Sequence, residues 1–210
     1  MKKIDKKTLV LTSLINIIPI IVGCMLWEQL PDMIPTHFGI DGTPNDWSSK
    51  AFTVFGIPLM ILFFHLLCVG ITSQDPKYDN INDKLFGIMV WTCPAVSLLL
   101  MITCYGACLG WEFNVSKYVL AASGVLFMVI GNYLPKCKQN YTMGIKLPWT
   151  LDNEENWNKT HRFAGFLWVI GGGSIVVNTF VGSEWLFIAI VVAMVLIPTI
   201  YSYFYFKKEK

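Results

Sequence analysis

The placement of charged residues constrains this chain most, because it leaves six long blocks without a single Asp, Glu, Lys or Arg. Each block is close to the roughly 20 residues that an α-helix needs to cross a hydrocarbon core of about 30 Å. Only 14% of all residues are charged, against about 25% in an ordinary soluble domain. These features exclude a soluble enzyme, a disordered chain and a small disulfide-stapled secreted module.

The sequence therefore predicts an all-α polytopic membrane protein, since backbone amides in hydrocarbon must be hydrogen-bonded within the protein. We expect a single membrane domain over residues 1–210, a bundle of six transmembrane helices with both termini cytoplasmic. The expected spans cover residues 8–27, 52–72, 85–109, 118–134, 163–181 and 185–206.

The basic residues predict the orientation of these spans. With six crossings, 14 Lys and Arg residues fall on the side of the termini, and only Lys50 and Lys117 fall on the other side. Basic residues concentrate on the cytoplasmic side of membrane proteins. The 28–51 loop is therefore expected outside and the 135–162 loop inside, where basic groups meet anionic lipid headgroups rather than nucleic acid.

The external 28–51 loop is longer than a connection between two helices requires, and its aromatic and aliphatic residues argue against disorder. Prolines and glycines mark tight turns, and Asp41-Gly42 suits a turn with a positive φ. We expect a folded cap on the outer membrane surface that presents acidic side chains.

The cytoplasmic 135–162 loop is also long and apolar. We expect extended or turned backbone over 144–149, because Pro148 disfavours helical geometry at Leu147. A short interfacial helix over about 153–161, capped by Thr150 or Asp152, should then lead directly into the fifth span.

Both loops carry recognisable motifs. The segment LPDMIPTHFGIDGTPNDWSSK (residues 30–50) resembles a domain of unknown function that is common in bacterial membrane proteins. The segment GIKLPWTLDNEENWNKTHRFAG (residues 144–165) resembles the hallmark of the SdpI family of multi-pass immunity proteins. One departure is Lys146-Leu147, where the family often has Arg-Thr; lysine keeps the charge but lacks the bidentate fork of arginine.

The resemblance implies a protein of the bacterial cell membrane that protects its producer against a secreted antimicrobial toxin and has no catalytic residues. It also implies a toxin peptide or protein as the external partner and a sequestered autorepressor as a cytoplasmic partner. The residues expected to face the toxin are His37, Asp41, Gly42 and Trp47. The expected cytoplasmic motif consists of Lys146, Pro148, Trp149, Thr150, Glu154, Trp157, Thr160, His161 and Arg162.

Two other functions stay open from the residues alone. A small-solute transporter or channel would need polar groups inside the spans, where His65 is the only strongly ionisable side chain and Asn16 adds an amide. The alternative use of these two residues is hydrogen bonding between helices. A membrane sensor would only recruit a transcription regulator to the cytoplasmic loop.

No metal or cofactor is expected. One histidine with scattered carboxylates, such as His37 and Asp41, lacks the three or four ligands of a zinc site. The six cysteines have no regular spacing and are expected as free thiols. Gly106-x-x-x-Gly110 and Gly171–Gly173 permit close helix packing, inside the bundle or in a homo-oligomer.

Overall fold

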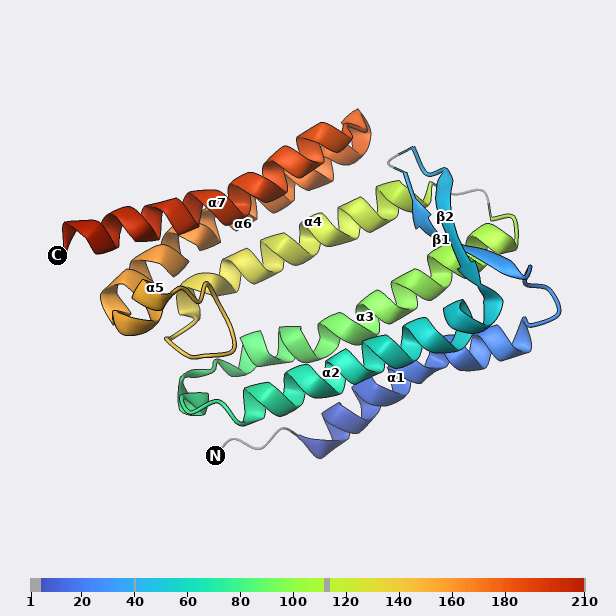
Figure 1. The fold of residues 1–210 in the computed structure, drawn as a ribbon, viewed down its shortest axis with the longest axis horizontal. Coiled ribbons are helices and arrows are strands. Elements are labelled where there is room, and N and C mark those ends of the chain that lie inside the picture. Colours follow the sequence, from blue (N-terminus) through green and yellow to red (C-terminus); the bar gives the residue numbers. More distant parts are fainter. Residues whose placement is uncertain (1–4, 40, 112–113, 210) are drawn as a thin grey trace. The chain divides into compact units, whose positions relative to one another are not determined.

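The computed structural model describes residues 5–39, 41–111 and 114–209 (Figure 1). Six of its helices are long and apolar enough to cross a membrane, which confirms the predicted all-α fold with six spans. They are α1 (Lys6–Met25), α2 (Ile57–Ser73), α3 (Asp83–Cys108), α4 (Val115–Tyr133), α6 (Glu154–Val181) and α7 (Glu184–Lys208). The short helices are η1 (Phe52–Gly56), η2 (Tyr78–Asn80), η3 (Leu134–Lys136) and α5 (Pro148–Asp152).

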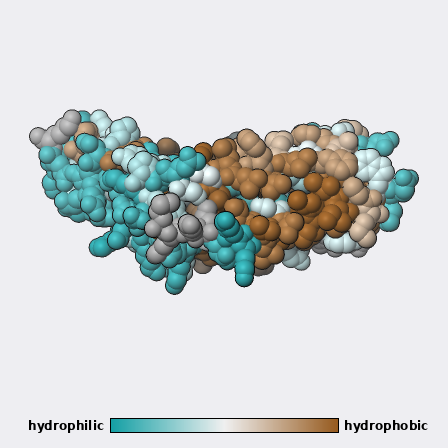
Figure 2. Space-filling view, turned by 90° about the horizontal axis from the view of Figure 1, so that it is seen from below, coloured by the Kyte–Doolittle hydropathy of each residue, from teal (hydrophilic) through white to brown (hydrophobic). Residues whose placement is uncertain are grey.

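The long helices leave large apolar side chains uncovered. Leu14 of α1 and Phe63 of α2 are 56% and 61% exposed, and the face drawn in Figure 2 carries a broad apolar patch. A soluble protein rarely exposes a continuous apolar patch of this kind. The surface is therefore suited to contact with lipid tails.

Internal contacts divide the chain into two compact units. The N-terminal unit comprises Lys2–Gly70 and Ile88–Lys117, and the C-terminal unit comprises Ile71–Gly87 and Tyr118–Lys210. Both α2 and α3 continue from one unit into the other, and the connection between them belongs to the C-terminal unit.

The N-terminal unit contains a β-hairpin that was not anticipated within the expected cap. Strands β1 (Met33–Phe38) and β2 (Pro44–Ser49) pair antiparallel, with Met33 opposite Ser49 (Figure 1). Leu30 and Ile34 anchor the hairpin in a core with Val54 and Tyr105. Gly42 has a φ of 87°, which confirms the positive-φ turn predicted at Asp41-Gly42.

The C-terminal unit brings α4 and α6 together at two pairs of glycines. A Cβ on Gly124 would lie 2.7 Å from the Gly172 carbonyl oxygen, and a Cβ on Gly165 would lie 2.7 Å from that of Gly131. Members of each helix are seven residues apart, which is two helical turns, so both pairs lie along one line of contact. The backbones touch there because no side chain separates them.

Neighbouring glycines in α6 face different partners. A Cβ on Gly171 would strike Met194 of α7, one on Gly172 would strike α4, and one on Gly173 would meet nothing within 4 Å. This order follows from the rotation of about 100° per residue in an α-helix. Packing inside the unit accounts for Gly171 and Gly172, while the homo-oligomer stays a prediction.

The 135–162 loop differs from the expectation at one cap and at residues 148–149, which were expected to be extended or turned and are helical. Leu147 is extended, with φ −112° and ψ 152°, as predicted from Pro148. However, Pro148 starts α5 after the N-cap residue Leu147, and the Thr150 hydroxyl accepts the Leu147 amide rather than capping the next helix. The α6 cap is Asn153, whose side chain accepts a hydrogen bond from the Asn156 amide, so the predicted cap was wrong. From Glu154, α6 continues without a break through the fifth span.

Candidate functional sites in the two long loops

The hairpin of the N-terminal unit exposes the side chains predicted to face a partner. His37, Asp41 and Trp47 are all exposed, and Trp47 retains 47% of its accessible surface. His37 Nδ1 lies 2.5 Å from Asn45 Oδ1, which joins the two strands through their side chains. The hairpin therefore presents an imidazole, a carboxylate and an indole on a fixed backbone.

The Asp41 carboxylate is held by its own turn. Asp41 Oδ1 accepts hydrogen bonds from the Thr43 amide at 3.0 Å and from the Thr43 hydroxyl at 2.7 Å. These two bonds favour the charged form and lower the pKa of Asp41 from its ordinary value. The hairpin tip thus stays negatively charged at neutral pH.

Residues outside the predicted motif fix the hairpin tip. Ser116 Oγ donates to the Gly39 carbonyl at 2.5 Å, and Asn114 Nδ2 donates to the Asp41 carbonyl at 3.4 Å. At the other end, Lys50 Nζ donates to the Trp27 carbonyl at 3.1 Å. The pattern of the 28–51 loop gave no signal for Asn114 and Ser116, because they lie about 75 residues away along the chain.

Trp157 is the centre of the folded 135–162 loop. Its side chain is fully buried, and its Nε1–H donates to the Cys137 carbonyl at 2.7 Å. Its ring stacks on the His161 ring with centroids 4.0 Å apart. Leu85, in the first turn of α3, completes this core.

The hydrogen bonds of His161 define its tautomer. Its Nε2 accepts from the Ile145 amide at 2.9 Å, so this nitrogen carries no proton. The proton of the neutral ring is therefore on Nδ1, which donates to the Trp157 carbonyl at 2.8 Å. Gly144, with a φ of 107°, allows the chain to pass so closely that a Cβ there would collide with His161 Nε2.

The other buried members of the motif form two further hydrogen-bonded groups. Thr150 Oγ1 donates to the Ile145 carbonyl and accepts from the Leu147 amide. Thr160 Oγ1 donates to Asn156 Oδ1, and Asn156 Nδ2 donates to the Ser202 carbonyl of α7. The first group fixes the backbone of the loop, and the second joins the start of α6 to α7.

Trp149 also contacts α7. Its Nε1–H donates to Ser202 Oγ at 2.9 Å, and its ring packs against Tyr203 and Phe206. The remaining motif residues have exposed side chains: Lys146, Pro148, Glu154 and Arg162. These four residues are therefore accessible to a partner. The buried side chains of Thr150, Trp157, Thr160 and His161 instead stabilise the folded 135–162 loop.

The buried carboxylate of Asp75, which the sequence did not reveal, joins the connection between α2 and α3 to the folded 135–162 loop. Asp75 is 6% exposed, and its Oδ2 accepts from the Tyr141 amide and the Thr142 hydroxyl, both at 2.9 Å. Lys77 Nζ donates to Gln139, whose Nε2 donates to the carbonyls of Thr150 and Leu151. No local pattern predicts the bonds of Asp75 and Lys77, because their partners are more than 60 residues away along the chain.

The polar side chains predicted inside the spans lie in the N-terminal unit. His65 Nε2 is 3.1 Å from Thr12 Oγ1, which links α2 to α1. Asn16 Nδ2 donates to the Thr12 carbonyl of its own helix at 2.8 Å. Among the described residues, no three His, Cys, Asp or Glu side chains are grouped as a metal ion requires.

Cys137 is expected to be a poorly reactive thiol. It is 4% exposed, and burial raises the pKa of its thiol from 9.0 to about 11. Since the thiolate is the reactive form, its population at neutral pH falls about a hundredfold. Maleimide labelling followed by peptide mass spectrometry should show slow modification that accelerates as the pH rises toward 11. A cysteine at the exposed neighbouring position, Lys138→Cys, is the control, and equal rates at both positions would contradict this picture.

Comparison with known proteins places both loops in recognised regions. Residues 136–202 match the SdpI/YfhL protein family, and residues 14–62 match a domain of unknown function, DUF1648. The chain is 29% identical over 203 residues to the Immunity protein SdpI of Bacillus subtilis (strain 168), an alignment that covers 92% of this chain and 96% of that protein. No solved structure matches the chain. The chain is thus a multi-pass bacterial membrane protein, and both predicted resemblances are confirmed, to the SdpI family in its C-terminal half and to the domain of unknown function in its N-terminal half.

Proposed function

We propose that this protein is a membrane immunity protein that protects a bacterium against a secreted antimicrobial toxin. The observation that carries the proposal is the similarity to an immunity protein over 92% of the chain. Six apolar helices and two folded loops are consistent with a role at the membrane. We propose that the protein acts by binding and without catalysis.

We propose that the hairpin is the toxin-facing surface and lies outside the cell. Its charge supports this assignment, because Asp41 offers a carboxylate that stays ionised and would attract a cationic partner to the hairpin. Trp47 adds an exposed aromatic surface, which is typical of a binding hot spot. A rigid hairpin also loses little conformational entropy on binding.

We propose that the 135–162 loop lies in the cytoplasm and is the surface that captures a soluble autorepressor. Buried hydrogen bonds fix its backbone, while Lys146, Glu154 and Arg162 remain exposed for contact. This second role is separable from protection, because the two loops are far apart in sequence and belong to different compact units.

Protection is tested by expressing the chain in a toxin-sensitive strain and measuring survival against candidate toxins. We expect Trp47→Ala to reduce survival at least tenfold, since about 1.4 kcal/mol of lost binding is a tenfold change in affinity. Arg162→Ala should leave survival unchanged and reduce recruitment of the regulator. Equal amounts of each variant in the membrane fraction are the control for folding.

Survival no better than with an empty vector, across all cognate toxins, would refute the immunity proposal. Loss of survival in Arg162→Ala with Trp47→Ala unaffected would reverse the assignment of the two loops.

A further inference from the structure

The β-hairpin has one open edge, which is formed by β2. Five of the six residues of β2 are exposed, whereas β1 contains the buried residues Ile34 and Pro35. Pro35 also lacks an amide proton, so it cannot donate a hydrogen bond to a further strand. A strand that joins this sheet would therefore join it at β2.

The register of the hairpin determines which backbone groups of β2 point to this edge. The Lys50 amide donates to the Asp32 carbonyl at 2.8 Å, so these two residues form a hydrogen-bonded pair across the hairpin. Hydrogen-bonded and non-hydrogen-bonded pairs alternate along antiparallel strands. Trp47 and Ser49 belong to non-hydrogen-bonded pairs, so their N–H and C=O groups point away from β1.

Two of these four outward groups are occupied, and the other two are open. Asp46 Oδ1 accepts from the Trp47 amide at 2.8 Å, and the Thr53 hydroxyl donates to the Ser49 carbonyl at 3.1 Å. Within the described part of the chain, the Trp47 carbonyl and the Ser49 amide make no hydrogen bond. They flank Ser48 and point the same way. One residue of a strand running parallel to β2 can therefore satisfy both with its own N–H and C=O.

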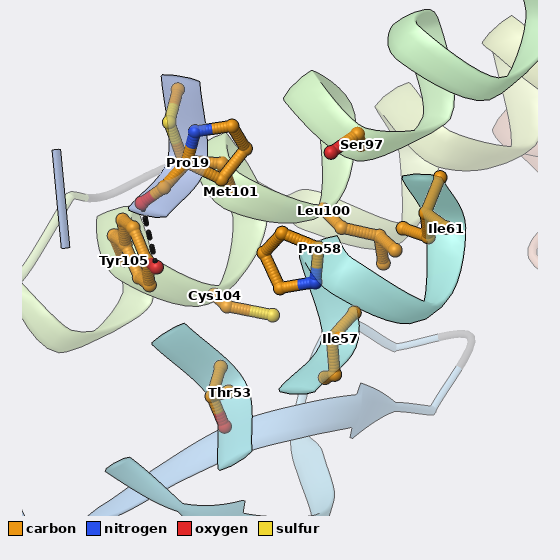
Figure 3. Close-up of a pocket in the computed structure, with 10 residues that line it drawn as sticks. All are labelled: Pro19, Thr53, Ile57, Pro58, Ile61, Ser97, Leu100, Met101, Cys104 and Tyr105. Carbon is orange, nitrogen blue, oxygen red and sulfur yellow. Dashed lines mark hydrogen bonds between the residues drawn. The ribbon is translucent and has the colours of Figure 1, made fainter. Parts of the chain in front are cut away.

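The core beneath the hairpin holds this edge in place. Ile34 of β1 packs with Val54 and Tyr105, and the Tyr105 hydroxyl donates to the Pro19 carbonyl at 3.1 Å (Figure 3). The cavity in this region has a volume of about 20 Å³, which is too small to admit a peptide segment. A peptide would therefore bind on the exposed side of the hairpin, where the backbone is already in place.

The charge of the hairpin selects the partner. Residues 33–49 contain two carboxylates, Asp41 and Asp46, and no Lys or Arg. Both carboxylates are exposed, and Asp46 lies at the open edge because its Oδ1 holds the Trp47 amide. A second copy of this hairpin would bring like charges together at the edge, whereas a cationic strand would be attracted to it.

We propose that the β2 edge binds a cationic peptide segment in an extended conformation, which adds to the hairpin as a third strand. Bonds to the Trp47 carbonyl and the Ser49 amide hold the backbone of the segment, and the carboxylates of Asp41 and Asp46 select basic side chains. The exposed Trp47 ring offers apolar contact. This inference rests on the proposed toxin-facing role of the hairpin and specifies how it would hold a segment of the toxin.

Amide hydrogen exchange at single-residue resolution tests the added strand. The full-length protein is placed in phosphatidylcholine nanodiscs, which carry no net charge. The probe is a synthetic peptide of about eight residues that alternates Lys and Val and has blocked ends. We expect it to slow exchange of the Ser49 amide at least about tenfold, while the Ser48 amide, which already faces β1, changes little. The same peptide with Glu in place of Lys should leave Ser49 unchanged.

Three results would overturn the proposal. The first is unchanged exchange at Ser49 with the Lys–Val peptide at millimolar concentration, and the second is equal slowing by both peptides. The third is slow exchange at Ser49 in the free protein that becomes fast when each nanodisc holds a single copy, because a second copy would then cover the edge.

Two charge variants test the selection of basic side chains. Asp46→Asn keeps an oxygen for the Trp47 amide and removes the charge, so it should weaken binding of a fluorescent Lys–Val peptide about threefold. Asp32→Asn is the matched control, because the Asp32 carboxylate lies outside both strands and 3.6 Å from Lys50 Nζ. A larger effect of Asp32→Asn would contradict the proposal. Peptide binding can fail while the chain still protects cells, so failure here is distinguishable from failure of the immunity proposal.

Discussion

Replacing Trp157 with alanine is expected to destabilise the C-terminal unit by about 3–5 kcal/mol, which is the usual cost of truncating a fully buried Trp or Phe. The indole is completely buried, donates to the Cys137 carbonyl and stacks on His161. Its loss would leave a cavity and an unpaired carbonyl at the same point. The change is measured as a shift in the denaturation midpoint of the purified protein in detergent.

Two milder variants separate the contributions to this effect. Trp157→Phe keeps the stacked ring and loses the N–H donor, so it should cost about 1–2 kcal/mol. Trp149→Ala removes a half-buried indole at the surface of the same motif and should cost less than Trp157→Ala. If Trp149→Ala were the more damaging change, the position of Trp157 at the centre of the loop would be wrong.

Replacing Gly172 with alanine is expected to have the second largest effect, a loss of about 3 kcal/mol of stability. The new Cβ would lie 2.5 Å from the Gly124 carbonyl oxygen, and backbone cannot move aside as a flexible side chain can. Overpacking of this kind costs about 1–3 kcal/mol, and the contact here is at the severe end. Thermal unfolding of the purified protein gives the measurement.

Gly173 is the matched control for this prediction. It is the next residue of the same helix, and a Cβ there would meet nothing within 4 Å. Gly173→Ala should therefore be neutral, or stabilising by up to about 1 kcal/mol, because alanine favours the helix. Similar behaviour of the two variants would show that α4 and α6 do not touch at Gly124 and Gly172.

The spans were predictable because a membrane imposes one dominant physical requirement. A block such as 8–27 must be apolar and helical, and no distant residue can change that. Local stereochemistry was equally reliable: Gly42 takes its positive φ and Leu147 is extended before Pro148. These features depend on one or two neighbouring residues.

The hairpin was not predicted because its strands lack the usual signal. Prolines stand within or at the start of both strands, at Pro35 and Pro44, and alternation of polar and apolar residues is weak. Pairing is irregular between Pro35 and Phe38. The strands form because Leu30 and Ile34 are anchored in a core with residues of η1 and α3, which the local pattern does not reveal.

The sequence predicted which segments form the candidate sites, but it did not predict the role of each residue within them. The motif over 144–165 identified the folded loop. However, its residues include buried side chains such as Thr150 and exposed ones such as Arg162. Which residues are buried depends on Asp75, Gln139 and Ser202, whose contribution is visible only in three dimensions.

The division of the chain into two units has a mechanical consequence for α2 and α3. The chain passes between the units after Gly70 in α2 and after Gly87 in α3, and a Cβ on either residue would meet nothing within 4 Å. Packing therefore does not require a glycine at these points, while glycine weakens a helix by roughly 0.5–1 kcal/mol relative to alanine. Both helices that connect the units thus carry a helix-weakening residue where the chain passes from one unit to the other.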